Sequence, residues 1–332
     1  MTHPRLIALC LGFIATAASA QAADYRVLDR IAGPDGGWDY ARVDAANHRV
    51  LVTRGTSVMV VDPVARTAAA GFAPGQRLHD ALPVNGGAEV LVTNGGSDTV
   101  VFADARSGAA LATVHTGEGP DAAAFDPRSG LVLVMDHAGG DITLVDPKTH
   151  AVAGTIVVGG DLEAAAVDGA GKAYVNVEDR NEIVAIDIAG RKVLNRYKLA
   201  GCDGPTGLAY DAADRELIAA CDGTTVVVAA ATGEVLQSLP TGKGADGVAF
   251  DAARKRAFVP AGRAGTLAIL AFRKGKAAIV QTLPTAVSAR TIALDEATGR
   301  VYLPSARFGP PPAGGGRPPM IPGSFELIVV GL

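Results

Sequence analysis

The chain has 332 residues, 41 of them glycine, and a formal net charge of −4 at pH 7. This mild acidity, with no cluster of Lys and Arg, argues against a nucleic-acid-binding protein, because such binding depends on neutralising phosphates. Nearly half of the residues are apolar (48%), which is enough for a large packed core.

The N-terminus has the pattern of a cleaved secretory signal. Arg5 precedes an apolar run over residues 6–17, and small residues follow at 18–20. The run is shorter than the roughly 20 apolar residues of a spanning helix, and no second long apolar segment follows. We therefore expect residues 1–20 to be a signal peptide and residues 24–332 to form one domain. The mature protein would be periplasmic or secreted, with no transmembrane segment.

A motif of an apolar residue followed by Asp or Asn recurs along the rest of the chain. It ends at seven positions that lie 40 to 44 residues apart: Asp44, Asn85, Asp126, Asp168, Asp211, Asp251 and Asp295. After each position come short runs rich in Val and Ile, bounded by Gly, Asp, Asn and Pro, which predict strands. Four strands in about 40 to 45 residues form the blade of a β-propeller. We predict an all-β fold, a seven-bladed β-propeller of four-stranded antiparallel blades.

The last repeat contains only three predicted strands before the chain ends at Leu332. An additional strand is predicted at Asp24–Gly33, and it resembles the fourth strand of the other repeats. Pairing this N-terminal strand with the last strand of the chain would complete blade 7. Such closure removes the exposed sheet edges that promote aggregation.

The seven repeated Asp and Asn residues are predicted to begin tight turns and not to be catalytic. Their side chains favour the first position of a turn, where they accept hydrogen bonds from nearby backbone N–H groups. The apolar residue before each of them should be buried between blades. These residues are Val43, Val84, Phe125, Val167, Tyr210, Phe250 and Leu294.

The residues five positions before these turns are expected at the mouth of the central channel. They are Asp39, Asp80, Asp121, Glu163, Thr206, Asp246 and Arg290, of which five are acidic. One interpretation is a ring of carboxylates that binds a cation or a cationic ligand. The alternative is that each acid bonds the backbone at the start of its own strand.

Other polar residues lie close to these positions in the sequence or are expected on the same face of the propeller. They are Arg42, Arg54, His79, Asn94, His115, Asp136, His137, Glu178, Asp179, Arg180 and Arg263. A metal site of His79, His115 and His137 with Asp80 or Asp121 has the ligand types that zinc and copper prefer. The alternative is that these histidines are solvated loop residues. A divalent metal is thus the one cofactor that the sequence suggests.

The longest irregular segment is Ser305–Glu326, between the second and third strands of blade 7. Long loops inside a compact domain are usually functional or disordered. The segment could form a lid over the channel mouth, with Phe308, Arg317 and Met320 above the opening. The alternative is a surface excursion.

Three cysteines are present, and Cys10 lies in the predicted signal. Cys202 precedes the innermost strand of blade 5, and Cys221 ends its neighbouring strand, so antiparallel pairing brings them close. A disulfide is expected in an oxidising compartment. Their spacing of nineteen residues fits neither a redox pair nor a zinc finger.

The stretches "LVTRG" at Leu51–Gly55 and "LVTNG" at Leu91–Gly95 resemble the signature of the YVTN-repeat, or YncE-like, propeller family. The resemblance implies an exported seven-bladed propeller, in a family mostly without assigned chemistry. We therefore expect a monomer that binds a small molecule or an envelope protein. The alternative is a metal-dependent, lactonase-like hydrolase with its site at the channel mouth.

Overall fold

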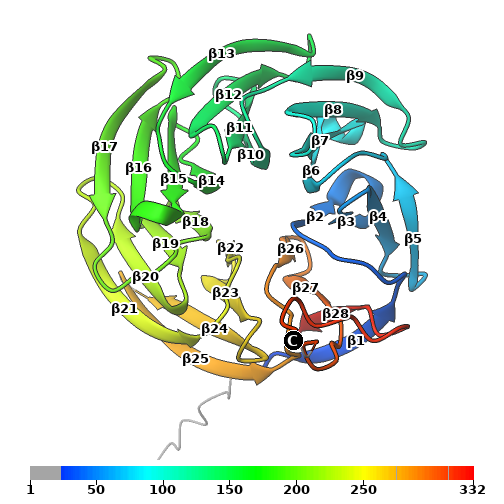
Figure 1. Cartoon of the computed structure of the whole chain (residues 1–332). Helices are drawn as coiled ribbons and strands as arrows, with labels where there is room; N and C mark the ends of the chain where they lie inside the picture. Colours follow the sequence, from blue (N-terminus) through cyan, green and yellow to red (C-terminus); the bar gives the residue numbers. More distant parts are fainter. Residues whose placement is uncertain (1–23, 274, 313) are drawn as a thin grey trace, which may run out of the picture.

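A computed structural model describes residues 24–332 except residues 274 and 313. Seven four-stranded sheets stand around a central channel like the blades of a fan (Figure 1). Every paired strand in each sheet is antiparallel to its neighbour. The predicted seven-bladed propeller is confirmed.

The first four blades follow the chain in order, from the innermost strand to the outermost. Blade 1 contains β2 (Ala41–Asp44), β3 (Arg49–Arg54), β4 (Ser57–Asp62) and β5 (Thr67–Phe72). Blade 2 contains β6 (Leu78–Val84), β7 (Glu89–Asn94), β8 (Thr99–Asp104) and β9 (Ala110–His115). Blade 3 contains β10 (Pro120–Asp126), β11 (Leu131–Asp136), β12 (Asp141–Asp146) and β13 (Ala151–Val157). Blade 4 contains β14 (Leu162–Val167), β15 (Lys172–Val177), β16 (Glu182–Asp187) and β17 (Lys192–Lys198).

The remaining blades follow the same order until the last one. Blade 5 contains β18 (Gly207–Asp211), β19 (Glu216–Ala220), β20 (Gly223–Ala229) and β21 (Val235–Gly242). Blade 6 contains β22 (Ala249–Asp251), β23 (Arg256–Ala261), β24 (Thr266–Arg273) and β25 (Lys276–Pro284). Blade 7 contains β26 (Ala293–Asp295), β27 (Arg300–Ser305), β28 (Glu326–Gly331) and β1 (Arg26–Ala32). Short 3-10 helices occur at η1 (Ala45–Asn47), η2 (Asn85–Gly87) and η3 (Glu178–Arg180).

The ring closes through the N-terminal strand. β1 pairs antiparallel with β28, with Ile31 opposite Leu327. Ile31 is buried in a cluster that also contains core residues of blade 1, so β1 joins the two ends of the ring. The predicted closure of blade 7 is therefore confirmed.

The core lies between blades. Seven clusters of buried apolar side chains each combine residues from two adjacent blades. Near the axis the blades come so close that only the smallest residues fit. A Cβ added at Gly207 of β18 would lie 2.5 Å from the backbone of Gly247, which precedes β22. This contact explains why Gly and Ala recur in the innermost strands.

The repeated turn residues have the predicted role in five of the seven blades. The carboxylates of Asp126, Asp168, Asp211, Asp251 and Asp295 accept hydrogen bonds from backbone N–H groups two to four residues later. Asp44 and Asn85 differ, because a 3-10 helix follows Asp44 and another begins at Asn85. Asp44 binds the side chains of Asn47 and Arg49, and Asn85 reaches the carbonyl of Pro147 in blade 3.

The predicted burial of the preceding apolar residue is wrong for Phe125, which is 41% exposed. Its ring lines an open groove beside Pro83, Pro127 and Pro147. Val84 is buried, and the other five are partly buried.

The predicted signal peptide lies outside the described residues. Over residues 24–332, apart from the two gaps, no helix is long and apolar enough to cross a membrane.

Candidate functional site

The seven positions predicted at the channel mouth lie at or just before the innermost strands, as the repeat requires. Their side chains occupy three environments. Asp39, Asp121 and Glu163 contact histidines. Asp80 is buried in an ion pair between blades. The remaining three, Thr206, Asp246 and Arg290, line a pocket.

The first histidine cluster joins blades 1, 2 and 3. His79 Nδ1 lies 2.7 Å from Asp39 Oδ2 and 3.6 Å from Asp121 Oδ1. These three side chains come from the loop before β2, from β6 and from β10. Asp121 Oδ1 is buried and has no hydrogen-bond partner in the described part of the chain.

The second cluster joins blades 3 and 4 and shares Asp121 with the first. His137, in the turn after β11, has its Nδ1 3.3 Å from Glu163 Oε1. The same Nδ1 lies 3.1 Å from the carbonyl oxygen of Leu162. The hydroxyl of Tyr40 in blade 1 donates to Glu163 Oε2 across the channel at 3.5 Å. The two clusters therefore form one continuous polar surface over blades 1 to 4.

The close approach of these groups changes their protonation. Burial raises the pKa of Asp121 well above its usual range, and the nearby charge of Asp39 adds to this. Burial also raises the pKa of Glu163. Burial alone would lower the pKa of His79, but the hydrogen bond to Asp39 and the two carboxylate charges raise it overall. The hydrogen bond to Glu163 raises the pKa of His137 to about 9.

Asp80 has a structural role. It is fully buried, and its carboxylate accepts from Nε and Nη2 of Arg42 at 2.9 and 2.5 Å. The backbone N–H groups of Ala81 and Ala123 also donate to it. Arg42 in turn donates to the carbonyl of Ala123. The pair thus links blades 1, 2 and 3. The bond from Ala81 N–H agrees with the alternative of a local backbone role, whereas the pairing with Arg42 was not predicted.

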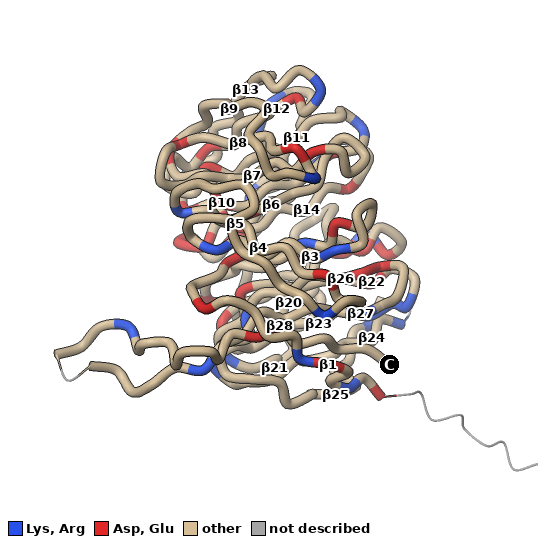
Figure 2. The backbone as a smooth tube through the Cα atoms, turned by 90° about the vertical axis from the view of Figure 1, so that its right-hand side faces the viewer, with Lys and Arg blue, Asp and Glu red and all other residues tan. Residues whose placement is uncertain are grey.

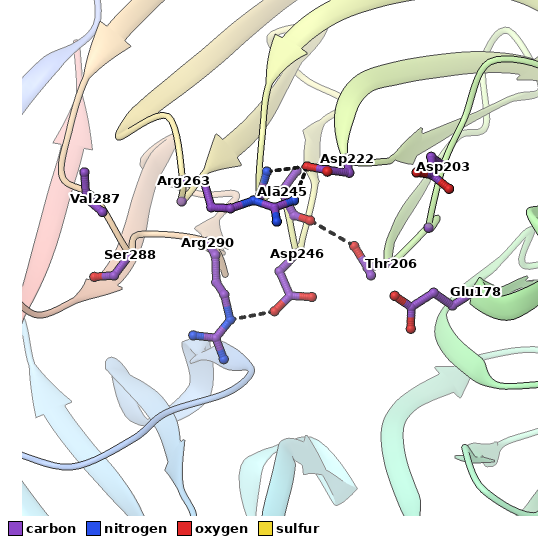
Figure 3. A pocket seen from close by; sticks show the side chains of 13 residues that line it. Glu178, Asp203, Thr206, Asp222, Ala245, Asp246, Arg263, Val287, Ser288 and Arg290 are labelled. Atoms are coloured by element: carbon purple, nitrogen blue, oxygen red, sulfur yellow. Dashed lines mark hydrogen bonds and ion pairs between the residues drawn. The ribbon is translucent and has the colours of Figure 1, made fainter. Parts of the chain in front are cut away.

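The other side of the mouth contains a pocket of about 700 Å³, formed by loops of blades 4 to 7 (Figure 3). Its charged lining residues are Glu178, Asp203, Asp222, Asp246, Arg263 and Arg290. Arg290 Nε lies 2.7 Å from Asp246 Oδ2, and Arg263 Nη2 lies 2.5 Å from Asp222 Oδ1. Both arginines are therefore already paired with an aspartate.

The pocket has two carboxylates in excess. Glu178 and Asp203 form no ion pair and no side-chain hydrogen bond with any described residue, and Figure 3 shows both at one side of the opening. Glu178 is partly buried, and burial raises its pKa. The partly buried Glu178 carboxylate therefore favours a cation as its partner, and the exposed Asp203 adds a second negative charge at the same opening.

Sequence reasoning missed Asp203 and Asp222. Both follow a cysteine and precede a glycine, in "CDG" at residues 202–204 and again at 221–223. The repeated tripeptide was the available signal, because it places two carboxylates next to the two expected disulfide partners. Trp38 was also missed. Its backbone carbonyl accepts from Arg290, and its ring lies 5.5 Å from that guanidinium.

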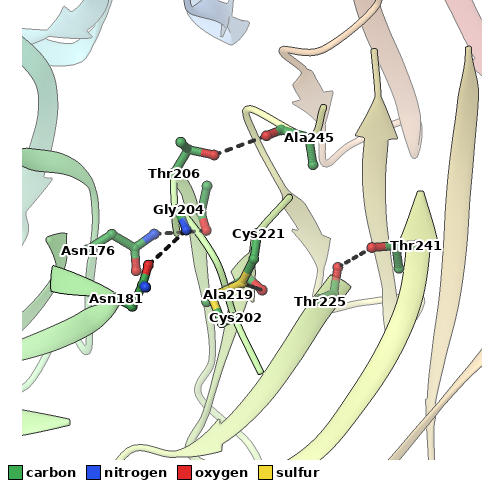
Figure 4. The surroundings of a disulfide bond; sticks show 11 residues. Asn176, Asn181, Cys202, Gly204, Thr206, Ala219, Cys221, Thr225, Thr241 and Ala245 are labelled. Atoms are coloured by element: carbon green, nitrogen blue, oxygen red, sulfur yellow. Dashed lines mark hydrogen bonds between the residues drawn. A yellow bond between two sulfur atoms is a disulfide. The ribbon is translucent and has the colours of Figure 1, made fainter. Parts of the chain in front are cut away.

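The disulfide between Cys202 and Cys221 is present, as predicted (Figure 4). The two Cα atoms are 5.3 Å apart, and both residues are buried. The bond joins the loop before β18 to the end of β19. It therefore fixes the two loops that carry Asp203 and Asp222.

The predicted metal set is wrong in one histidine. His115 is the last residue of β9, the outermost strand of blade 2, and it is exposed. It lies in neither cluster, because the outermost strand is far from the axis. The sequence repeat predicts the face of the propeller on which a residue lies but not its distance from the axis. His79 and His137 are both close to Asp121, whereas Asp80 is bound to Arg42.

Several other polar residues that the sequence predicts on this face hold loops in place. The Arg54 guanidinium donates to the carbonyls of Pro34, Gly36 and Gly37 and lies 4.0 Å from the ring of Phe325. Asn94 accepts from the backbone of Gln76. The Asp179 carboxylate accepts from Asp161 N, and Arg180 lies beside it at 3.7 Å. Asp136 is buried, which raises its pKa to about 7.

The long segment of blade 7 is not a lid in this structure. It forms a hairpin that extends away from the body of the propeller (Figure 2). Phe308 and Met320 pair as an isolated bridge at its base, and Asp35 accepts from the backbone of Gly323. The Phe308 ring is 42% exposed and lies 6.2 Å from Trp38, and Arg317 is exposed. Residues 309–319 of this hairpin are mostly proline and glycine. The hairpin therefore has few apolar side chains that could pack against the channel mouth.

Comparisons with known proteins agree on the fold. The chain is similar to a chain of hydrazine synthase from Kuenenia stuttgartiensis, with a TM-score of 0.68 at 14% identity over 80% of this chain and 92% of that one. It is also similar to a chain of the mitotic checkpoint complex (TM-score 0.71, 13% identity, 90% and 95% coverage). For U3-55K the TM-score is 0.72 at 11% identity, with 93% and 99% coverage. No protein-family model and no curated protein matches the chain. At these identities the likeness concerns the propeller fold alone.

Proposed function

We propose that this protein is an exported binding propeller that takes a small cationic ligand, such as an amine, at its channel mouth. The observation that carries the proposal is the charge balance of the pocket. Both arginines are held by aspartates, which leaves Glu178 and Asp203 without a partner among the described side chains.

The size of the pocket supports a small molecule as the ligand. A cavity of about 700 Å³ lies within the range that small-molecule sites occupy, roughly 300 to 1,000 Å³. Each arginine that lines the space is paired with an aspartate, and four carboxylates face two guanidinium groups, so that the pocket favours a positively charged ligand. Thr206 and Ser288 supply hydroxyls to the same space.

Two features support export. The first twenty residues have the composition of a secretory signal, and the buried disulfide is typical of proteins in oxidising compartments. The likeness of Leu51–Gly55 and Leu91–Gly95 to the YVTN repeat agrees with an exported propeller. Cell fractionation with N-terminal sequencing of the recovered protein tests this part. Recovery of uncleaved protein from the cytoplasm would contradict it.

The ligand class can be tested by calorimetry with putrescine as a cationic probe and succinate as an anionic one. We expect putrescine to bind and succinate not to bind. Glu178→Gln and Asp203→Asn should each weaken putrescine binding about tenfold or more, because each removes a charge-assisted hydrogen bond. Glu234→Gln is the matched control, since Glu234 is an exposed acid in an outer turn of blade 5. Preference for succinate, or equal effects of all three substitutions, would refute the proposal.

A further inference from the structure

We propose that Asp39, His79, Asp121, His137 and Glu163 form a centre for a divalent transition-metal ion on the blade 1 to 4 side of the channel mouth. This inference is independent of the amine pocket, which lies over blades 4 to 7. It rests on four properties of the cluster: convergence, an unpartnered buried oxygen, an excess of carboxylates over histidines, and ligand type.

The first property is convergence. The ligand atoms of Asp39, His79 and Asp121 all lie within 4.8 Å of one another, and so do those of Asp121, His137 and Glu163. Asp121 belongs to both sets and therefore lies at the middle of the centre. Four different blades supply these side chains, and the closed ring holds their backbones in place.

The second property is the unpartnered oxygen. Asp121 Oδ1 is buried and accepts no hydrogen bond from any described residue, yet it lies 3.6 Å from His79 Nδ1. A buried polar atom without a partner is destabilising, because it loses its hydrogen bonds to water and gains none in the fold. A bound metal ion would supply the missing partner. The side chain of Asp121 is only 14% exposed, so water reaches it poorly.

The third property is charge. Asp39, Asp121 and Glu163 form no ion pair with a Lys or Arg in the part of the chain that the structure describes. The equivalent acids Asp80 and Asp246 are each held by an arginine. Three carboxylates close together repel one another, and a divalent cation relieves that repulsion.

The fourth property is the ligand type. Two imidazole nitrogens with three carboxylates suit zinc and similar ions, whereas calcium and magnesium prefer oxygen alone. Each histidine turns its Nδ1 towards the carboxylates. On the other edge of the His79 ring, Nε2 lies next to Gly95, where a Cβ would come within 2.9 Å. The absence of a side chain at Gly95 leaves room for this edge of the ring, and the hydrogen bond between Nδ1 and Asp39 Oδ2 at 2.7 Å holds Nδ1 towards the centre.

The test uses the full mature chain without an affinity tag, freed of metal by a chelator and dialysed against Zn²⁺ or Co²⁺. We expect one or two ions per chain by elemental analysis, and a visible absorption band from bound Co²⁺. His79→Gln and Asp121→Asn should weaken binding by about 100-fold or more. Thermal unfolding of the metal-free variants checks that they fold. If His79→Gln does not fold, Asp121→Asn still tests the proposal, because asparagine has nearly the same shape as aspartate.

His150→Gln is the matched control. His150 Nε2 lies 2.7 Å from Glu89 Oε2, as close as His79 is to Asp39, but no third ligand joins this pair in the groups found among the described residues. We expect its metal affinity to equal that of the parent protein. Absence of bound Zn²⁺ and Co²⁺ at micromolar concentrations would overturn the proposal. Equal losses in His79→Gln and His150→Gln would overturn it as well.

Discussion

The two sides of the channel mouth use the same repeat position in different ways. On the blade 1 to 4 side, Asp39, Asp121 and Glu163 face histidines. On the blade 5 to 7 side, Asp246 faces Arg290, and the nearby Asp222 faces Arg263. An arginine is always charged and fixes its carboxylate permanently, whereas a histidine can also act as a metal ligand. The comparison shows that the neighbour of each acid, and not the acid itself, decides its role.

The largest effect is expected from removing the strand that holds both sides in one ring. Deletion of residues 24–33 removes β1 and exposes the edge of β28. We expect loss of the cooperative thermal transition, measured by circular dichroism, and loss of both binding sites. Replacement of residues 310–318, in the projecting arm of the same blade, by a short turn is the control and should leave the transition unchanged. An unaltered transition in the β1 deletion would show that each side is stable without closure.

The next largest effect on stability compares two acids at the same repeat position, the buried Asp80 and the part-exposed Asp39. Asp80→Ala leaves Arg42 without its partner, and breaking a buried pair costs about 3 to 5 kcal/mol. Asp39→Ala in the metal-free protein should cost about 1 kcal/mol or less, because that carboxylate is part-exposed. Urea unfolding measures both values. Equal losses would mean that Asp39 is as structural as Asp80.

The disulfide belongs to the pocket side alone, so its removal should affect the two sides unequally. The double variant Cys202→Ser with Cys221→Ser should lower the free energy of unfolding by about 2 to 4 kcal/mol. Putrescine binding should weaken, because the loops of Asp203 and Asp222 lose their link. Zinc binding should be unchanged. A parallel loss of both ligands would show that the two sides are coupled.

The smallest effect concerns an unpaired acid remote from both sites. Glu216 at the start of β19 is buried, its Oε2 has no hydrogen-bond partner among the described residues, and burial raises its pKa. The folded protein therefore keeps the Glu216 proton to a higher pH than the unfolded chain does. The free energy of unfolding falls as the pH rises from about 4 to the folded pKa.

Glu216→Gln removes this fall in the free energy of unfolding with rising pH, because the glutamine side chain does not titrate. We expect the variant to be more stable than the parent at pH 8, and to show no such gain at pH 4, in urea unfolding at the two pH values. This result would show what an unpaired buried carboxylate costs where no ligand is proposed. The same shift at both pH values would contradict the pKa argument.

Much of the fold was predictable because the repeat has a constant length. The seven turn residues define seven blades, and the missing strand of blade 7 indicates that Asp24–Gly33 closes the ring. The repeat phase also places Asp39 and Asp121 near one another. It cannot show that Arg42 reaches Asp80, because a long side chain can bridge to either neighbouring blade. It also gives no distance from the axis, which is why His115 was grouped with His79.

The irregular segment was the least predictable part. Pro and Gly indicate that residues 305–326 are neither helix nor regular strand, but they do not give the direction in which the segment leaves the body. That direction depends on single contacts such as the one between Asp35 and the backbone of Gly323. Asp35 lies almost three hundred positions earlier in the chain, and no repeat relates it to Gly323.

The pairing of β1 with β28 also has a consequence for biosynthesis. β1 is synthesised about three hundred residues before β28, the strand with which it pairs. Blade 7 stays incomplete until β28 is present. Until then β1 has unpaired backbone N–H and C=O groups, which can pair with the strands of other chains.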